Sequence, residues 1–77
     1  MKNITYHAGK LEIIGRVKSS PNGNPRYLIM IDGFRCYTKP DSMHGYVVSN
    51  YKSKVVHATI GTYYGRPTLN TLIGDQP

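Results

Sequence analysis

Arginine, lysine and tyrosine side chains are concentrated in the segment Asn24–Lys39, NPRYLIMIDGFRCYTK. An arginine offers planar, forked donors that suit a phosphate, and a tyrosine ring offers a plane on which a base can stack. If the segment forms two paired strands, alternation places one set of these side chains on a single face. That set is Arg26, Arg35, Tyr37 and Lys39. The pattern therefore predicts a site for a phosphate-bearing ligand.

This face would be extended by Arg16, Lys18 and the loop Asn22–Asn24, which precede it. A separate second patch lies in turns later in the chain. The second patch consists of Tyr51, Lys52, Lys54, Tyr63, Tyr64 and Arg66. The complete set of predicted ligand-binding residues is Arg16, Asn24, Arg26, Arg35, Tyr37, Lys39, Tyr63 and Arg66.

The basic face has a simpler interpretation. Arginine beside tyrosine is a favourable cross-strand pair on any solvated antiparallel sheet, with or without a ligand. Leu28 and Met30 share the face, however, and apolar side chains beside basic ones favour a binding surface.

Enzymatic constellations are nearly absent from the sequence. His7, His44 and His57 are isolated, without the HExxH spacing of a zinc enzyme, and Cys36 has no CxxC partner. No phosphate-binding glycine loop leads into a helix. The sequence therefore predicts a protein that is not an enzyme, with no catalytic residues, no cofactor and no metal site.

A β-hairpin positions the predicted face. Asp32-Gly33 predicts a two-residue type I′ turn, which fixes the register of the two strands from Ile31 opposite Phe34 to Tyr27 opposite Thr38. The expected core face is Tyr27, Ile29, Ile31, Phe34, Cys36 and Thr38. The expected outer face is Arg26, Leu28, Met30, Arg35, Tyr37 and Lys39.

A strand over residues 11–17 is expected before the hairpin. Its alternation puts Leu11, Ile13 and Val17 on one face and Glu12, Ile14 and Arg16 on the other. Gly15 predicts a bend or a bulge in this strand. The residues from Ser19 to Pro25 predict a loop.

The second half of the chain predicts short elements separated by turns. One helical turn at Met43-His44 would be capped by Asp41 or Ser42 and ended by Gly45, before an extended segment Tyr46–Val48. A strand Val55–Ile60 would bury Val56, Ala58 and Ile60, with a bulge at Gly61. A turn Tyr64–Pro67 and a last strand Thr68–Ile73 would follow.

Five or six short strands at a spacing of about 8–12 residues predict an all-β, mainly antiparallel barrel. The two common small barrels, OB-like and SH3-like, both fit. We expect an N-terminal arm or edge strand over residues 1–10, a single barrel domain over residues 11–73 and a tail over residues 74–77.

Composition and net charge limit the classes of partner and the cellular location that we expect. The chain of 77 residues carries a formal net charge of +6, which indicates an anionic partner or serves solubility alone. One cysteine excludes an intrachain disulfide and fits a reducing, intracellular setting. The N-terminus has no apolar signal core, and no run spans a bilayer, so we expect a cytoplasmic protein without a membrane partner. The small core would gain from homo-oligomerisation.

The motif Gly23-Asn24-Pro25-Arg26-Tyr27 resembles a family of small bacteriophage-encoded β proteins of unknown function with a GNPRY-type turn. The similarity extends from Val17 to Gly61. Its further matches are Thr38, Asp41, Tyr46 and Asn50. The resemblance implies a phage origin, the cytoplasm of an infected bacterium and a small β fold, and it implies no activity.

Three functional hypotheses follow. The first is a phage accessory barrel that binds a phosphate-bearing nucleotide ligand, most directly single-stranded nucleic acid. The second is an oligomeric anti-defence protein that traps a small nucleotide signal. The third is an inhibitor that presents its basic face to an acidic host protein. A structural role in the virion is a weaker fourth hypothesis.

Overall fold

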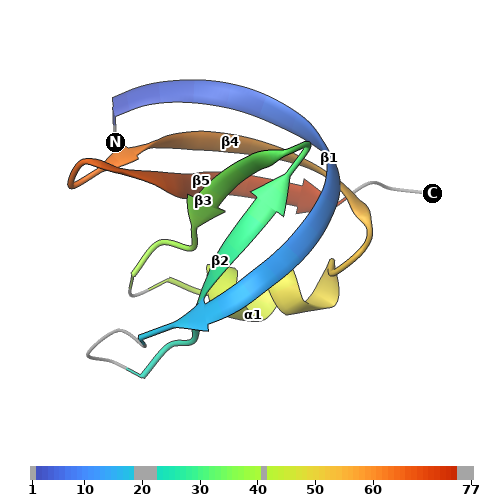
Figure 1. Cartoon of the computed structure of the whole chain (residues 1–77), viewed down its shortest axis with the longest axis horizontal. Helices are drawn as coiled ribbons and strands as arrows, with labels where there is room; N and C mark the ends of the chain where they lie inside the picture. The colour runs from blue at the N-terminus through green and yellow to red at the C-terminus, as the bar shows by residue number, and fades with distance from the viewer. Residues whose placement is uncertain (1, 19–22, 41, 75–77) are drawn as a thin grey trace.

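The computed structural model describes residues 2–18, 23–40 and 42–74. Its elements are β1 (Lys2–Val17), β2 (Arg26–Ile31), β3 (Phe34–Tyr37), α1 (His44–Asn50), β4 (Val55–Tyr63) and β5 (Arg66–Gly74). The five strands form a closed barrel in the order β1-β2-β3-β5-β4 (Figure 1). Adjacent strands are antiparallel except for β3 and β5, which run parallel. The prediction of a small all-β barrel is confirmed.

The strand order distinguishes between the two expected barrels. After α1, the chain returns so that β4 lies beside β1, which gives the spatial order β4-β1-β2-β3 of a Greek key. The fifth strand then closes the ring between β4 and β3. A five-stranded Greek-key barrel is the OB-like architecture.

The hairpin has the predicted register. Asp32 and Gly33 adopt φ values of 51° and 77°, as a type I′ turn requires. The observed pairs are Leu28–Tyr37, Ile29–Cys36, Met30–Arg35 and Ile31–Phe34. Beyond the ladder, the amide of Tyr27 donates to Oγ1 of Thr38 at 3.0 Å, and the amide of Thr38 donates to the Tyr27 carbonyl at 3.0 Å.

One member of the predicted core face is misplaced. Phe34 follows the turn at the rim of the barrel, where its side chain is 44% exposed. The centre of its ring lies 4.5 Å from the centre of the His7 ring. Alternation fixes the face on which a side chain lies, but burial also depends on how far the barrel extends over it.

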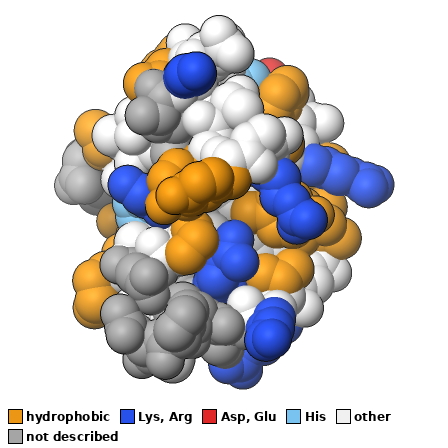
Figure 2. Space-filling view, turned by 90° about the vertical axis from the view of Figure 1, so that its left-hand side faces the viewer, with side chains coloured by type: hydrophobic (Ala, Val, Ile, Leu, Met, Phe, Trp, Pro, Cys, Tyr) orange, Lys and Arg blue, Asp and Glu red, His pale blue; other side chains and the backbone are white. Residues whose placement is uncertain are grey.

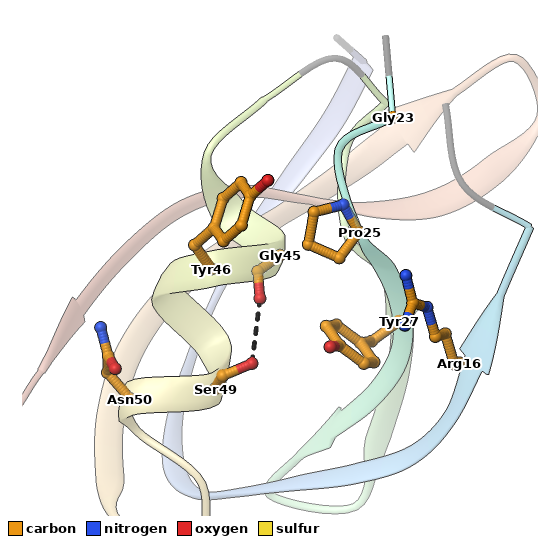
Figure 3. Close-up of a pocket in the computed structure, with 8 residues that line it drawn as sticks. All are labelled: Arg16, Gly23, Pro25, Tyr27, Gly45, Tyr46, Ser49 and Asn50. Atoms are coloured by element: carbon orange, nitrogen blue, oxygen red, sulfur yellow. Dashed lines mark hydrogen bonds between the residues drawn. The ribbon is translucent and has the colours of Figure 1, made fainter. Parts of the chain in front are cut away.

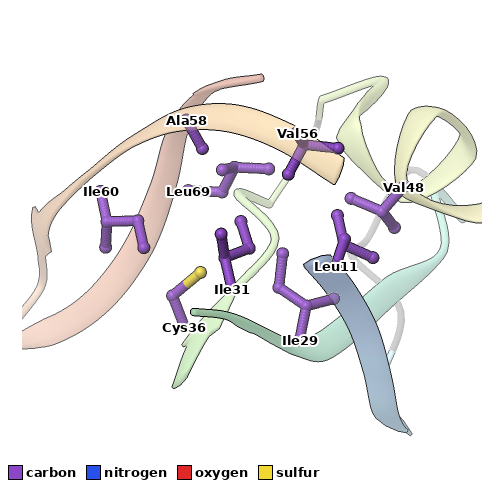
Figure 4. Close-up of a cluster of buried hydrophobic side chains, with 9 residues drawn as sticks. All are labelled: Leu11, Ile29, Ile31, Cys36, Val48, Val56, Ala58, Ile60 and Leu69. Carbon is purple, nitrogen blue, oxygen red and sulfur yellow. The ribbon is translucent and has the colours of Figure 1, made fainter. Parts of the chain in front are cut away.

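The barrel interior is filled by one apolar cluster (Figure 4). Its members are Leu11, Ile29, Ile31, Cys36, Val48, Val56, Ala58, Ile60 and Leu69. Val48 comes from α1, which lies across one end of the barrel (Figure 1). Burial raises the pKa of the Cys36 thiol to about 12, so this cysteine is a neutral part of the core.

β1 is longer than expected. Residues 2–10 pair with β4 and residues 11–17 pair with β2, so one bent strand serves two neighbours. The first ten residues were expected to be an arm or an edge strand. From residue 2 on they are instead part of a strand inside the closed ring, because β4 returns to pair with them.

The predicted bulge at Gly15 is present and has a consequence that the alternation pattern missed. The register of β1 against β2 shifts between Ile13 and Gly15, after which Arg16 lies opposite Tyr27. Directly opposed residues share a face. Arg16 therefore lies on the same face of the sheet as Tyr27, and not on the outer face that was predicted. Val17, which was predicted on the face of Leu11 and Ile13, lies on the outer face opposite Arg26.

The segment after Pro40 is more helical than expected. The predicted extended segment Tyr46–Val48 lies inside α1, because burying Val48 in the core outweighs the strand preference of a β-branched residue. Gly45 does not end the helix. It lies where α1 meets the start of β2, and a Cβ there would collide with the carbonyl oxygen of Pro25. Asp41 lies outside the described residues.

The last two strands differ from the prediction in their details. The irregularity lies at Thr59/Ile60, opposite Thr71 and Leu69, so the extra residue is Asn70 and not Gly61. The β4–β5 turn consists of residues 64 and 65 only, and β5 runs from Arg66 to Gly74. Residues 75–77 of the predicted tail lie outside the described residues.

Gly45→Ala is expected to destabilise the protein by about 1–3 kcal/mol, since the new methyl group overpacks the contact between α1 and Pro25. The sign is diagnostic because the same change in an unhindered helix stabilises by about 1 kcal/mol. Chemical denaturation measures the difference. Gly15→Ala is the control, because its Cβ would meet nothing within 4 Å. A Gly45→Ala variant as stable as the wild type would contradict this packing.

Candidate functional site

The outer face of the hairpin meets the β4–β5 turn in a cavity of about 200 Å³, here called the tyrosine pocket. The parallel contact between β3 and β5, at Tyr37 and Thr68, sets the beginning of β5 beside the end of β3. Residues distant in sequence therefore become neighbours. The pocket is lined by Arg26, Tyr37, Pro40, Tyr63, Tyr64, Arg66 and Thr68.

Two cation–π contacts organise this pocket. The guanidinium carbon of Arg66 lies 5.7 Å from the centre of the Tyr37 ring, and Nζ of Lys39 lies 5.6 Å from the centre of the Tyr63 ring. Such contacts contribute about 0.5–1 kcal/mol at exposed sites. They pair each cation with a ring, so a phosphate and its base can be contacted together.

Arg26 is held in place by the backbone of the hairpin. Its Nε and Nη2 both donate to the carbonyl oxygen of Thr38, each at 3.3 Å. A guanidinium has five N–H donors, so this anchor leaves others for a ligand. The arginine is thus oriented before any ligand arrives.

Tyr64 belongs to the predicted second patch but is missing from the set of predicted ligand-binding residues. It is 89% exposed at the tip of the β4–β5 turn, and its ring packs edge-on against Tyr63 at 4.5 Å. Its φ of 50° is left-handed, a conformation that suits Gly, Asn or Asp and costs a tyrosine about 1–3 kcal/mol. The strained backbone and the exposed ring together make Tyr64 a candidate for ligand binding. The sequence signal was the Tyr63-Tyr64-Gly65 run, in which Tyr64 takes the first central position of a two-residue turn.

The structure brings five of the eight predicted site residues together: Arg26, Tyr37, Tyr63 and Arg66 line the pocket, and Lys39 lies over the Tyr63 ring. Arg35 is exposed on the same outer face, opposite Met30, but does not line the pocket. Asn24 lies in the loop before β2, outside the pocket, and Arg16 lies on the other side of β2. Of the second patch, Tyr51 packs against the core.

The charge distribution around the pocket favours an anion. Figure 2 looks onto the end of the molecule that carries the β4–β5 turn, and Lys and Arg side chains surround exposed hydrophobic ones there. All ten Lys and Arg residues lie in the described chain, whereas its carboxylates are Glu12 and Asp32. Neither carboxylate lines the tyrosine pocket.

Residues 2–18, 23–40 and 42–74 lack the features of a metal site and of a membrane-spanning helix. This part of the chain contains no group of three or more His, Cys, Asp or Glu side chains placed to hold a metal ion. Within the same residues, no helix has the length and apolar character needed to cross a membrane.

No family model, curated protein or solved structure matches this chain. The resemblance to small phage proteins therefore stays a prediction, and the geometry of the site is the basis for a functional proposal.

His44, the first residue of α1, is expected to make stability depend on pH. Burial, and secondarily the charge of Lys39, lowers the pKa of His44 from 6.5, and its Nδ1 has no hydrogen-bond partner among the described residues. Between the lowered pKa and 6.5, the unfolded chain binds more protons than the folded one. The free energy of unfolding therefore falls as pH drops through this window.

Thermal unfolding above and below about pH 6.5 measures this loss. His44→Gln should lose less stability than the wild type on acidification, because the titrating group is gone while His7 and His57 remain in both proteins. Equal losses in the two proteins would contradict the half-buried placement of His44.

Proposed function

We propose that this barrel binds single-stranded nucleic acid, without catalysis, across the outer face of β2 and β3 and against the β4–β5 turn. The observation that carries the proposal is the tyrosine pocket, where Arg26 and Arg66 meet three tyrosine rings. In OB-like barrels, the face of strands 2 and 3 and the loops between strands 1–2 and 4–5 bind oligonucleotides. In this chain, three cations and three tyrosines gather at that same place: Arg26, Lys39, Arg66, Tyr37, Tyr63 and Tyr64.

Basic and aromatic side chains have different roles in the proposed binding. Arg26, Lys39 and Arg66 contact successive phosphates, while Tyr37 and Tyr64 offer planes to the bases. Stacking on an aromatic ring is worth about 1–3 kcal/mol per base and tolerates every base. A pocket of aromatic planes and cations therefore supports binding with little sequence preference.

The dimensions of the tyrosine pocket favour a strand over a small molecule trapped there. A cavity of about 200 Å³ is smaller than the roughly 300–1,000 Å³ of pockets that enclose a whole small ligand. It suits one base or one phosphate of a longer molecule. Sequestration of a small nucleotide signal and binding to an acidic protein remain the alternatives, and competition with mononucleotides or with nuclease-treated lysate separates them from strand binding.

Affinity for a labelled oligothymidylate is expected to fall by about 20-fold between roughly 50 and 200 mM salt, because three phosphate contacts give a slope of about −2 in log K against log salt. Arg66→Ala should weaken binding by about 5–150-fold, through the loss of a charge-assisted phosphate contact worth about 1–3 kcal/mol. Fluorescence anisotropy measures both effects.

Lys54→Ala is the matched control, since it removes one positive charge from the turn before β4, outside the pocket. It should change affinity far less than Arg66→Ala. Equal losses in the two variants, or affinity that is indifferent to salt, would contradict binding at this pocket.

Tyr64→Asn is expected to move stability and binding in opposite directions. Asparagine accepts the left-handed conformation at this turn position, so the variant should be as stable as the wild type or up to about 1 kcal/mol more stable. It should bind the oligonucleotide about 5–150-fold more weakly, because a stacking plane worth about 1–3 kcal/mol is lost. Denaturation and anisotropy on the same sample measure the two effects, and unchanged affinity would remove Tyr64 from the site.

A further inference from the structure

A second and larger cavity, of about 620 Å³, lies between the end of β1, the entry into β2 and the helix α1 (Figure 3). We call it the helix pocket. The described residues that line it are Arg16, Gly23, Pro25, Tyr27, Gly45, Tyr46, Ser49 and Asn50. Its volume falls within the roughly 300–1,000 Å³ of pockets that enclose small ligands.

Two departures from regular structure create this pocket. The bulge in β1 turns Arg16 away from the outer face and sets it opposite Tyr27, and bulges beside binding sites commonly re-aim a side chain in this way. At Gly45, the absence of a side chain lets α1 approach Pro25 closely. Tyr46, Ser49 and Asn50 of α1 line the cavity, and in Figure 3 Ser49 lies between Asn50 and Tyr27 of β2.

The chemistry of the lining suits one nucleotide. Arg16 is exposed, and it is the one charged side chain among the described lining residues, so an anion would meet no carboxylate there. The ring of Tyr46 is 48% exposed and offers a plane for a base. Asn50 adds both a donor and an acceptor at the edge of the same cavity.

The helix pocket and the tyrosine pocket share the start of β2. Pro25 and Tyr27 line the helix pocket, and Arg26 between them lines the tyrosine pocket, because consecutive residues of a strand face opposite sides. The two cavities therefore lie on opposite sides of β2 and meet at its start, so a strand bound at Arg26 would reach the second cavity by passing around the beginning of β2.

We propose that the helix pocket takes a further nucleotide of the bound strand, with its phosphate on Arg16 and its base on Tyr46. This inference rests on the proposed function, since the tyrosine pocket binds the preceding nucleotides.

The test compares oligothymidylates of about 4 and about 8 nucleotides, within the range of site sizes of single OB-like barrels. Arg16→Ala and Tyr46→Ala should each weaken binding of the longer strand by about 5–100-fold, while the shorter strand is bound as by the wild type. Tyr46→Phe keeps the ring and should restore the affinity for the longer strand, which separates stacking from a merely structural role.

Lys10→Ala and Tyr6→Ala are the matched controls, because both residues are exposed on β1 and line neither pocket. If Arg16→Ala and Tyr46→Ala bind both lengths as tightly as the wild type, the second site is wrong while the proposed function stands. If the wild type itself binds neither length, the proposed function fails first. Binding of thymidine monophosphate that Tyr46→Ala abolishes, without any loss for the longer strand, would overturn the shared strand and assign the pocket to a free nucleotide.

Discussion

The parallel contact between β3 and β5 is the constraint on which the candidate site depends. Tyr37 lies opposite Thr68, and this register closes the ring. Without it, the hairpin and the β4–β5 turn would be separate basic surfaces. With it, Tyr37 and Arg66 come within 5.7 Å, measured from ring centre to guanidinium carbon. The contact that closes the barrel therefore also brings the residues of the site together.

Buried threonine hydroxyls hold the two sides of this contact. Thr38 is fully buried, and its hydroxyl accepts the amide of Tyr27 while its carbonyl accepts two donors from Arg26. Thr68 is 2% exposed, and its hydroxyl donates to the carbonyl of Arg66 at 3.0 Å. Side chains of the site thus project from backbone whose polar groups are satisfied. Such preorganisation reduces the ordering cost that binding must overcome.

Local patterns in the sequence were sufficient for the hairpin and for much of the core. Asp32-Gly33 determines its own turn type, and strict alternation placed Val56, Ala58 and Ile60 inside. Long-range pairing was not readable in this way. The nearness of Tyr63 and Arg66 to Tyr37 depends on the contact of β5 with β3, which no local pattern encodes.

Single residues account for the other misassignments. The glycine at position 15 signalled a bulge, but an alternation count that ran straight through it put Arg16 on the wrong face. Gly45 was predicted to end a helix because glycine is common just after helices. Glycine is also found where two backbone segments approach closely, and this is its role at position 45. The segment around Val48 is helical because packing of Val48 into the core outweighs the local preference of valine for a strand.

The most direct measurement is an amide chemical-shift map of the protein titrated with an oligothymidylate. Binding at the hairpin and the β4–β5 turn predicts shifts concentrated at Tyr37, Lys39 and residues 64–66, with the opposite wall around Tyr6 and His57 unchanged. Shifts that centre on that wall, or no shifts at all at low salt, would contradict nucleic-acid binding by this face of the barrel.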